Sequence, residues 1–192
     1  MVRGATANYA LPSSTGLQVA WTTWDVSQRS DVTLRFENEG WTAEGHIGID
    51  NAQFVMRLSA QWMVQQFLLF RDMDEPDLWL ATDGGGRWGE INGAHRPDLD
   101  GCVDIDLAGT PFTNAIPIRR LPLHVGHSAS LNVITVDIET LDVVVVPQIY
   151  TRLGTHIWRY NSLAQSIDVE VEVDDFGFIK DEPGAFQRVA SQ

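Results

Sequence analysis

Residues 98–122 read DLDGCVDIDLAGTPFTNAIPIRRLP, and they contain the best helix candidate of the chain. Thr110 can cap a helix, and Pro111 suits the first helical position. The apolar residues that would then line one side are Phe112, Ala115 and Ile116. Pro117 removes one backbone hydrogen bond and clashes with the preceding turn, at a cost of about 3 kcal/mol. We therefore expect a short or kinked helix over Thr110–Arg120.

On both sides of this segment, apolar and polar residues alternate, which is typical of half-buried antiparallel strands. In SIDVEVEV (166–173), every second residue from Ile167 onward is Ile or Val, and the residues between are acidic. DVTLRFENEGW (31–41) alternates in the same way and then turns at Asn38–Gly40, as a β-hairpin does. AQWMVQQFLLFRD (60–72) mixes both periods, but its density of aromatic and apolar residues favours a strand. The sequence thus predicts a mainly β fold with a single α-helix.

Length and composition limit the partners of the chain. A chain of 192 residues usually forms one domain, and we expect its ordered core to run from about residue 15 to about residue 188. Its formal net charge of -13 repels phosphate backbones, so nucleic acid is not an expected partner. The apolar runs are much shorter than the ~20 residues that cross a bilayer. With one cysteine and no continuous apolar run near the start, we expect a cytoplasmic protein.

Asp104 and Asp106 are the first candidates for catalysis. In a strand their side chains would leave the same face about 6.6 Å apart. That separation touches the range of roughly 6.5 to 9.5 Å between the carboxyls of inverting glycosidases. A hydrolase pair must flank the scissile bond from opposite sides, however, whereas neighbours on one strand stand side by side. The pattern therefore favours structural pairing of these aspartates with Arg119 or Arg120 over glycoside hydrolysis.

No spacing in the chain matches a metal or cofactor site. His124 and His127 lie three residues apart, but Gly126 between them indicates a loop, and zinc would need a third ligand. The segment Asp98–Gly101 lacks the acidic spacing of a calcium loop. Cys102 has no activating partner nearby in the sequence and is expected to be a small buried residue. We expect neither a metal nor a cofactor.

Two pairs of arginine and tyrosine lie on either side of an expected hairpin turn at Leu153–His156. Tyr150 and Arg152 share one face of the strand before the turn, and Arg159 and Tyr160 lie on the strand after it. Side chains that donate several hydrogen bonds from a rigid sheet suit a polar head group. They suit cross-strand pairing with the acidic strands equally well, and the sequence leaves both interpretations open.

Four segments in a fixed order carry a resemblance to a known family. They are DLDGCVDIDLAGTPFTNAIPIRRLPL (98–123), YTRLG (150–154), WRYNS (158–162) and VEVDDFGFIKDEPGAF (171–186). Over roughly residues 15–188 the chain resembles the bacterial glycolipid-binding family, which was first described as a domain of unknown function. The resemblance implies a spiral β-roll, a long antiparallel sheet wrapped around one α-helix. It also implies a homodimer and a cavity that takes a glycolipid or a similar amphipathic molecule.

Within that fold, the polar residues near the expected helix and hairpin are candidates for ligand binding. They are Asp104, Asp106, Thr113, Asn114, Arg119, Arg120, Tyr150, Arg152, Arg159 and Tyr160. A helix enclosed by a sheet must have its polar groups satisfied internally, so these residues would form either an internal network or the polar end of a pocket. Three functions stay open: non-enzymatic binding of an amphipathic ligand, hydrolysis of a glycoside or ester by Asp104 and Asp106, and a structural or interaction role as a dimer.

Arg119 and Arg120 are adjacent, and neighbours diverge by about 100° in a helix. We expect one of them to face inward and the other outward, and we favour Arg119 as the inward residue. If the inward arginine pairs with Asp104 or Asp106, its removal would leave a carboxylate buried without its partner. That loss would cost about 3 to 5 kcal/mol.

Overall fold

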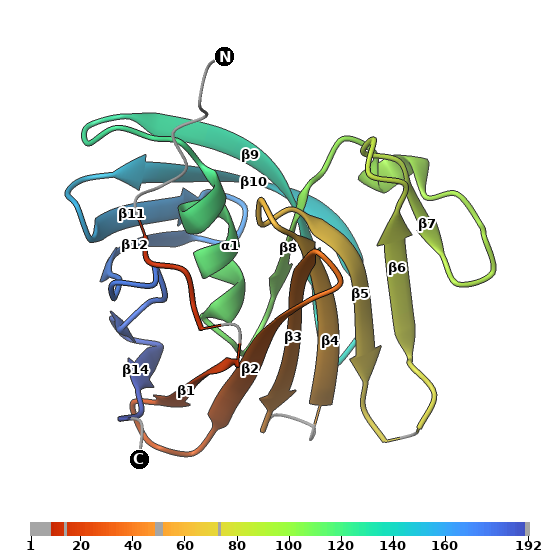
Figure 1. Ribbon diagram of the computed structural model, residues 1–192, viewed down its shortest axis with the longest axis horizontal. Coiled ribbons are helices and arrows are strands. Elements are labelled where there is room, and N and C mark those ends of the chain that lie inside the picture. Colours follow the sequence, from red (N-terminus) through yellow and green to blue (C-terminus); the bar gives the residue numbers. More distant parts are fainter. Residues whose placement is uncertain (1–8, 14, 49–51, 73, 191–192) are drawn as a thin grey trace.

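The computed structural model describes residues 9–13, 15–48, 52–72 and 74–190, and their strands form two sheets (Figure 1). The first sheet has nine strands in the spatial order β13-β14-β1-β2-β3-β4-β5-β6-β7. Their bounds are β1 Leu17–Thr23, β2 Arg29–Glu37, β3 Gly40–Ile47, β4 Ala52–Ser59, β5 Val64–Phe70, β6 Leu78–Thr82, β7 Trp88–Glu90, β13 Asp181–Glu182 and β14 Phe186–Arg188. All of its neighbouring strands pair antiparallel.

The second sheet has five strands in the order β12-β11-β10-β9-β8. Their bounds are β8 Asp104–Leu107, β9 Ser128–Val136, β10 Val143–Arg152, β11 Ile157–Ser162 and β12 Ile167–Glu172. Strands β9 to β12 pair antiparallel, whereas β8 runs parallel to β9. A parallel neighbour needs a crossover connection, and here the chain between β8 and β9 forms the helix α1, Phe112–Arg120.

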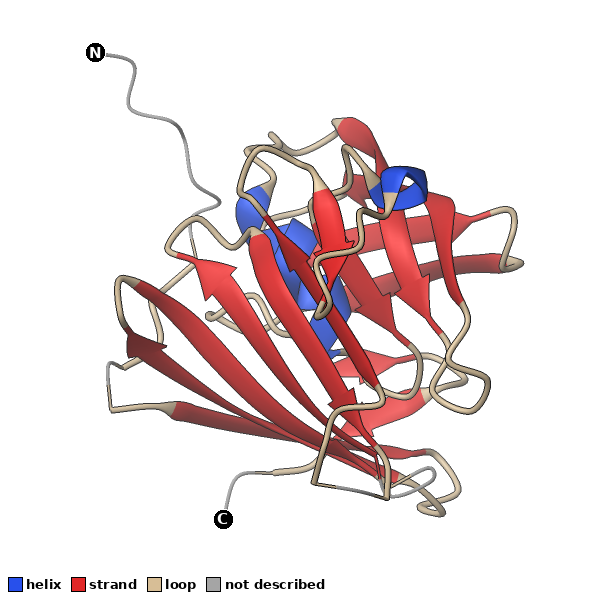
Figure 2. Ribbon diagram, turned by 90° about the vertical axis from the view of Figure 1, so that its right-hand side faces the viewer, coloured by secondary structure: helices blue, strands red, loops and turns tan. Residues whose placement is uncertain are grey.

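The helix α1 lies between the two sheets (Figures 1 and 2). Its residues from Phe112 to Arg119 are all buried, so both sheets cover it. This arrangement confirms the prediction of a mainly β roll around an α-helix. The described residues also include a short 3₁₀ turn, η2, at Pro97–Leu99, and none of their helices is long and apolar enough to cross a membrane.

The helix α1 begins at Phe112, with Pro111 at the N-cap position predicted for Thr110. Thr110 Oγ1 accepts a hydrogen bond from the Phe112 backbone N–H at 3.3 Å, and Pro111 has helical backbone angles. Ser30 of β2 donates to the same Thr110 oxygen at 2.7 Å, which ties the beginning of the helix to the first sheet. Pro117 lies inside the helix, which continues past it for three residues and ends at Arg120. The helix is short, as predicted.

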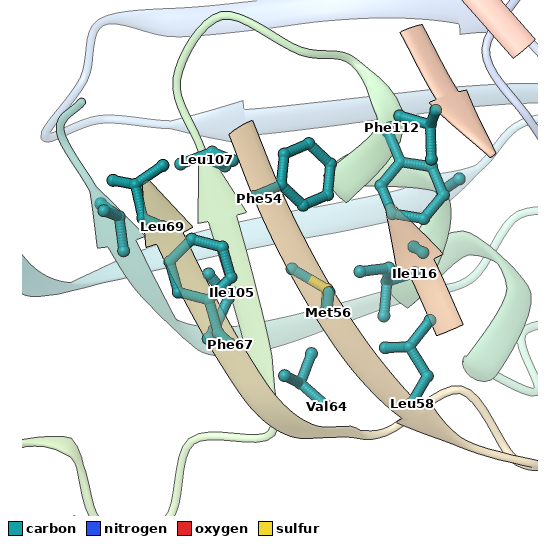
Figure 3. Close-up of a cluster of buried hydrophobic side chains, with 14 of the residues drawn as sticks. Phe54, Met56, Leu58, Val64, Phe67, Leu69, Ile105, Leu107, Phe112 and Ile116 are labelled. Carbon is teal, nitrogen blue, oxygen red and sulfur yellow. The ribbon is translucent and has the colours of Figure 1, made fainter. Parts of the chain in front are cut away.

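The apolar core lies mainly between the first sheet and α1. Figure 3 shows Phe54 of this sheet between Phe112 of the helix and Phe67 of β5, and its ring centroid is 6.2 Å from that of Phe112 and 6.4 Å from that of Phe67. A second apolar cluster joins the other side of α1 to β10, β11 and β12. Its buried members include Ile118 of the helix and Trp158 of β11. The two clusters hold the helix from opposite sides.

The two faces of strand β8 differ. Ile105 and Leu107 belong to the apolar core of the first sheet (Figure 3). Asp104 and Asp106 alternate with them along the strand, so they leave the opposite face, toward α1, where Asp104 is buried and Asp106 is partly exposed. The period of two therefore places two carboxyl groups inside the roll.

The predicted strands and turns are present. The hairpin predicted around Asn38–Gly40 joins β2 to β3, and its turn residues Asn38 and Glu39 both have positive φ, 50° and 61°. The ambiguous segment at 60–72 contains a strand, β5, as favoured. The turn predicted at Leu153–His156 joins β10 to β11.

Candidate functional site

Asp104 forms an ion pair inside the roll. Its side chain is 1% exposed, and it accepts hydrogen bonds from Arg120, the last residue of α1. Arg120 Nε lies 3.3 Å from Asp104 Oδ1, and Arg120 Nη2 binds Oδ2. Burial raises the pKa of Asp104, while the charge and hydrogen bonds of Arg120 act in the opposite direction. The predicted structural pairing is therefore confirmed for this aspartate.

Among the described residues, Asp106 has no cation as a hydrogen-bond partner. Thr113 Oγ1 donates to Oδ1 at 3.0 Å, and Gln148 Nε2 of β10 donates to Oδ2 at 2.9 Å. Burial raises the pKa of Asp106, and these neutral donors only partly offset the effect. Compared with a solvated aspartate, this carboxyl group is thus biased toward its neutral, protonated form.

Two stacked tyrosines continue the network away from Asp106. Tyr150 Oη lies 2.9 Å from Asn114 Oδ1 and 3.1 Å from Gln148 Oε1, and its single proton can serve one of these acceptors at a time. The Tyr150 ring stacks on Tyr160 of β11 with centroids 5.8 Å apart. Tyr160 in turn donates to Glu182 Oε1 of β13 at 2.6 Å. Hydrogen bonds and ring stacking thus connect four strands and the helix.

Glu182 is the second carboxyl group of this network. Burial raises its pKa, the hydrogen bond from Tyr160 lowers it, and the charge of Asp106 raises it further. The electrostatic effect of Asp106 on Glu182 indicates that the two carboxyls share one environment, although they come from different strands. We call the group Asp106, Thr113, Asn114, Gln148, Tyr150, Tyr160 and Glu182 the polar cluster.

The polar cluster has a partly exposed rim. Gln165, in the turn between β11 and β12, accepts a hydrogen bond from Gln148 Nε2 at 3.3 Å and is itself partly exposed. Glu182 is partly exposed as well. Ser162, at the end of β11, has a buried Oγ without a hydrogen-bond partner. Asp106 and Glu182 are the partly exposed members of the cluster, and its other members are buried.

The sequence did not indicate Gln148, Gln165 or Glu182. Gln148 could have been recognised from the alternation of β10. It lies between Val146 and Tyr150 on the buried face of this strand, where a polar side chain must find an internal hydrogen-bond partner. Glu182 lies in a two-residue strand, β13, whose pairing is too short to read from alternation.

Five of the ten predicted ligand-binding residues lie outside the polar cluster: Asp104 and Arg120, which pair with each other, and Arg119, Arg152 and Arg159. Arg159 points to the outer face of the second sheet, where it pairs with Asp168 and both side chains are about half exposed. Arg152 donates to the backbone carbonyl oxygens of Leu123, Thr155 and Gly154, at 2.9, 3.2 and 3.3 Å. These contacts fix loops at one end of the second sheet.

The expected contrast between Arg119 and Arg120 has a different form in the structure. Arg119 is the more buried of the two, as favoured, but the carboxylate Asp104 pairs with Arg120. The side chain of Arg120 is only 17% exposed, so it does not face outward either. Because a sheet covers α1 on each side, residues about 100° apart can both be enclosed.

The described residues contain no group of three or more histidine, cysteine or acidic side chains arranged to hold a metal ion. His124 and His127 are exposed, with ring centroids 6.0 Å apart. Cys102 is buried as predicted, and burial raises the pKa of its thiol. A groove of about 840 Å³ opens elsewhere, on the solvent face of β2 to β5, and its lining includes Asp31, Glu44 and Phe70 but no member of the polar cluster.

Comparison with known families gives the polar cluster its context. Residues 18–188 match the family described as "Putative glycolipid-binding". This chain belongs to that family. A crystal structure of a DUF1089 family protein from Pseudomonas aeruginosa is similar, with a TM-score of 0.69 and 27% sequence identity over 94% of this chain and 95% of that one. Among curated proteins, none matches the sequence.

The region shared with the glycolipid-binding family contains every residue of the polar cluster, from Asp106 to Glu182. The segment Tyr9–Ser13 precedes it. Tyr9 is nevertheless buried, at 8% exposure, although the sequence suggested an ordered core from about residue 15. A single tyrosine before Leu11 and Pro12 carries no periodic pattern, so its packing could not be anticipated.

Proposed function

We propose that this protein binds the sugar head group of a glycolipid, or of a similar amphipathic molecule, at the polar cluster and leaves it chemically unchanged. The observation that carries the proposal is the composition of the cluster. Asn114, Gln148 and the two tyrosine hydroxyls can each donate and accept hydrogen bonds. Sugar hydroxyls have the same dual capacity, so such groups can exchange their internal hydrogen bonds for bonds to a sugar.

The charge of the cluster favours a neutral head group. Asp106 and Glu182 both have raised pKa values, chiefly because they are buried. An anionic group placed beside them would add repulsion, whereas a hydroxyl can donate to either carboxylate. The family description, which names glycolipid binding, supports this choice of ligand.

Apolar side chains near the rim could accept the lipid part of such a molecule. Val144 lies on the same face of β10 as Gln148 and is 52% exposed. Leu163, in the same turn as Gln165, is 95% exposed. A polar site beside exposed apolar residues matches the two halves of an amphipathic ligand.

A second candidate function, hydrolysis of a glycoside or ester, is favoured by one observation. Asp104 is engaged by Arg120, but Asp106 and Glu182 approach the cluster from different strands, and burial raises the pKa of both. A hydrolase needs two carboxyl groups on opposite sides of its substrate, one of them protonated. Turnover of chromogenic glycosides or esters that disappears in Glu182→Gln would support hydrolysis over binding alone.

Native mass spectrometry of the protein purified from its own host tests the proposed binding. We expect a retained glycolipid in the wild-type protein and its loss in Glu182→Ala. The matched control is Glu172→Ala, which removes an exposed carboxylate paired with Lys180 and should retain the ligand. Thermal melts check that both variants fold. Absence of any retained lipid, or equal retention by both variants, would count against the proposal.

The resemblance adds a homodimer in the cytoplasm to this proposal. Light scattering coupled to size-exclusion chromatography, run with and without the retained lipid, measures the oligomeric state directly. A monomer of 21.4 kDa in both conditions would contradict the dimer.

A further inference from the structure

Arg119 is a buried cation with few hydrogen bonds. The residue is 6% exposed, and its Nη2 donates to the backbone oxygen of Ala10 at 3.2 Å. Its Nε and Nη1 are buried, and neither has a hydrogen-bond partner among the described residues. A guanidinium carries five N–H groups, and the three on Nε and Nη1 lack an acceptor among the described residues.

The neighbours of Arg119 stabilise its charge without using these N–H groups. The guanidinium carbon lies 4.1 Å from the ring centroid of Trp62 and 5.9 Å from that of Phe178. Such cation–π contacts use the flat face of the guanidinium and leave its edge free. Burial lowers the pKa of Arg119 to about 10, so the group is still charged at neutral pH.

No carboxylate among the described residues pairs with Arg119. Asp174 is near enough to influence it electrostatically, but Asp174 Oδ2 accepts a hydrogen bond from Arg188 at 3.0 Å. Leaving a charged donor buried without an acceptor is costly, and native proteins seldom do so without a ligand or a functional reason. The free N–H groups of Arg119 therefore match what an incoming oxyanion requires.

A short segment of chain covers this arginine. We call Tyr9–Ser13 the strap. Ala10 N–H donates to the Asp175 carbonyl oxygen at 2.8 Å, Tyr9 Oη donates to the Thr155 carbonyl oxygen at 3.3 Å, and Trp158 Nε1 donates to Tyr9 Oη at 2.6 Å.

The strap is packed at two buried residues, Tyr9 and Pro12. Between them Ala10 is exposed and Leu11 is 71% exposed, so lifting the strap requires only these two side chains to leave their packing. Because the Ala10 oxygen is an acceptor for Arg119, displacing the strap would uncover the guanidinium and free one more of its N–H groups.

We propose that Arg119, held on the ring of Trp62, is the anchor of a binding site for the oxyanion of a phosphate group, which enters when the strap lifts. A planar guanidinium with free donors suits phosphate oxygens. The polar cluster holds two carboxyl groups, Asp106 and Glu182, and no cation, so it offers an oxyanion no charge partner, and the two sites differ in the chemistry that they accept. This inference does not depend on the sugar-binding proposal.

Nuclear magnetic resonance can test the site in the intact chain, because the Nε–H group of a buried arginine gives its own ¹⁵N–¹H signal. We expect the Arg119 signal to shift when inorganic phosphate is added across a millimolar series, at an ionic strength held constant with chloride. We expect the shift to be absent in Arg119→Met, which keeps an apolar contact for Trp62. Arg159→Met removes one exposed arginine and is the matched control, so the shift should persist in it.

Two further probes separate the possible sources of the phosphate. Dihexanoyl phosphatidic acid below its micelle concentration carries the group on a lipid, and glycerol 3-phosphate carries it without acyl chains. Binding about tenfold tighter for the lipid would assign the site to a lipid head group, and equal binding would assign it to a free phosphate compound. Failure of all three probes to shift the Arg119 signal, or an equal response to chloride, would overturn the site. If Arg119→Met fails to fold, the response of the wild-type Arg119 signal to phosphate, compared with its response to chloride, still tests the site.

The role of the strap has a separate test. Ala10→Pro removes the N–H group that binds the Asp175 oxygen, and a hydrogen bond of this kind corresponds to about a fivefold change in an equilibrium constant. We expect phosphate to bind about fivefold tighter to Ala10→Pro, because the strap then opposes entry less. Unchanged affinity would show that the strap does not gate the site.

Discussion

Two groups of strands enclose the helix α1 and differ in the polarity of the side chains that they present to it. One group is β2 to β5, and the other is β8, β10 and β11. The first group presents buried apolar residues such as Phe54, Met56 and Phe67. The second group presents Asp104, Asp106, Gln148 and Tyr150, all in hydrogen bonds. One wall of the roll is thus built for stability, and the other for directional contacts that a ligand could exchange for its own.

The largest effect should come from the apolar wall. Phe54→Ala removes a ring that is 1% exposed and contacts the rings of Phe67 and Phe112. We expect a loss of about 3 to 5 kcal/mol in the free energy of unfolding, because the cavity cannot fully collapse. Urea unfolding followed by circular dichroism measures it. A loss below about 1 kcal/mol would mean that this wall is not the main source of stability.

A somewhat smaller loss in the free energy of unfolding is expected when the ion pair of the polar wall, Asp104 with Arg120, is broken. Arg120→Ala leaves the 1%-exposed side chain of Asp104 without its partner, which costs about 3 kcal/mol after allowance for the partial exposure of Arg120. The double variant Asp104→Asn/Arg120→Ala should recover part of this loss, since no charge is then buried. If the single and double variants unfold at the same urea concentration, the ion pair does not explain the effect.

A third prediction concerns the pH dependence of the free energy of unfolding, to which the polar wall contributes through Glu182. The folded-state pKa of Glu182 is raised above its unfolded value, so the folded protein binds this proton more tightly. Its contribution to stability is therefore complete below the unfolded pKa of about 4 and is lost as the pH rises through the raised folded value. Glu182→Gln keeps an acceptor for Tyr160 but carries no charge.

We expect Glu182→Gln to be more stable than the wild type at pH 7 and equally stable near pH 4. Thermal melts at both pH values measure the difference. Glu172→Gln is the control, because hydrogen bonding and the charge of Lys180 lower the pKa of Glu172, so removing this carboxylate should not stabilise the protein at pH 7. A stability difference for Glu182→Gln that does not change with pH would contradict the raised pKa.

The apolar wall could be predicted from the sequence, but only part of the polar wall could. Alternation of apolar and polar residues is local, and so are the signals of Thr110 and Pro111 at the start of the helix, which is why the strands and α1 were foreseen. The pairing of Asp104 with an arginine of α1 was also foreseen, because Asp104 and Arg120 are only 16 residues apart in the sequence.

The remaining partners come from distant parts of the chain. Gln148 meets Asp106 across 42 residues, and Glu182 meets Tyr160 across 22. Such contacts depend on the register of strands and on the parallel pairing of β8 with β9, and neither is encoded by the residues of one segment. Arg119 is the more buried arginine, as favoured, but the expectation that Arg120 faces outward was wrong for a related reason, since a helix enclosed on both sides has no outward face.

The smallest effect is expected for Arg159→Ala. Arg159 and its partner Asp168 lie on the outer face of the second sheet, where water screens both charges and neither side chain packs on the helix. We expect no resolvable change in the melting temperature and no change in the glycolipid retained, although the arginine adjoins Tyr160 in the sequence.

Successive residues of a strand face opposite sides, so Arg159→Ala and Tyr160→Phe compare the two faces of β11 at neighbouring positions. Tyr160→Phe removes the hydrogen bond to the partly exposed Glu182 carboxylate and should destabilise the protein by about 1 to 2 kcal/mol. If Arg159→Ala lost the ligand, as Glu182→Ala is expected to, the binding surface would have to extend to the outer face, and the distinction between the two walls would not locate the site.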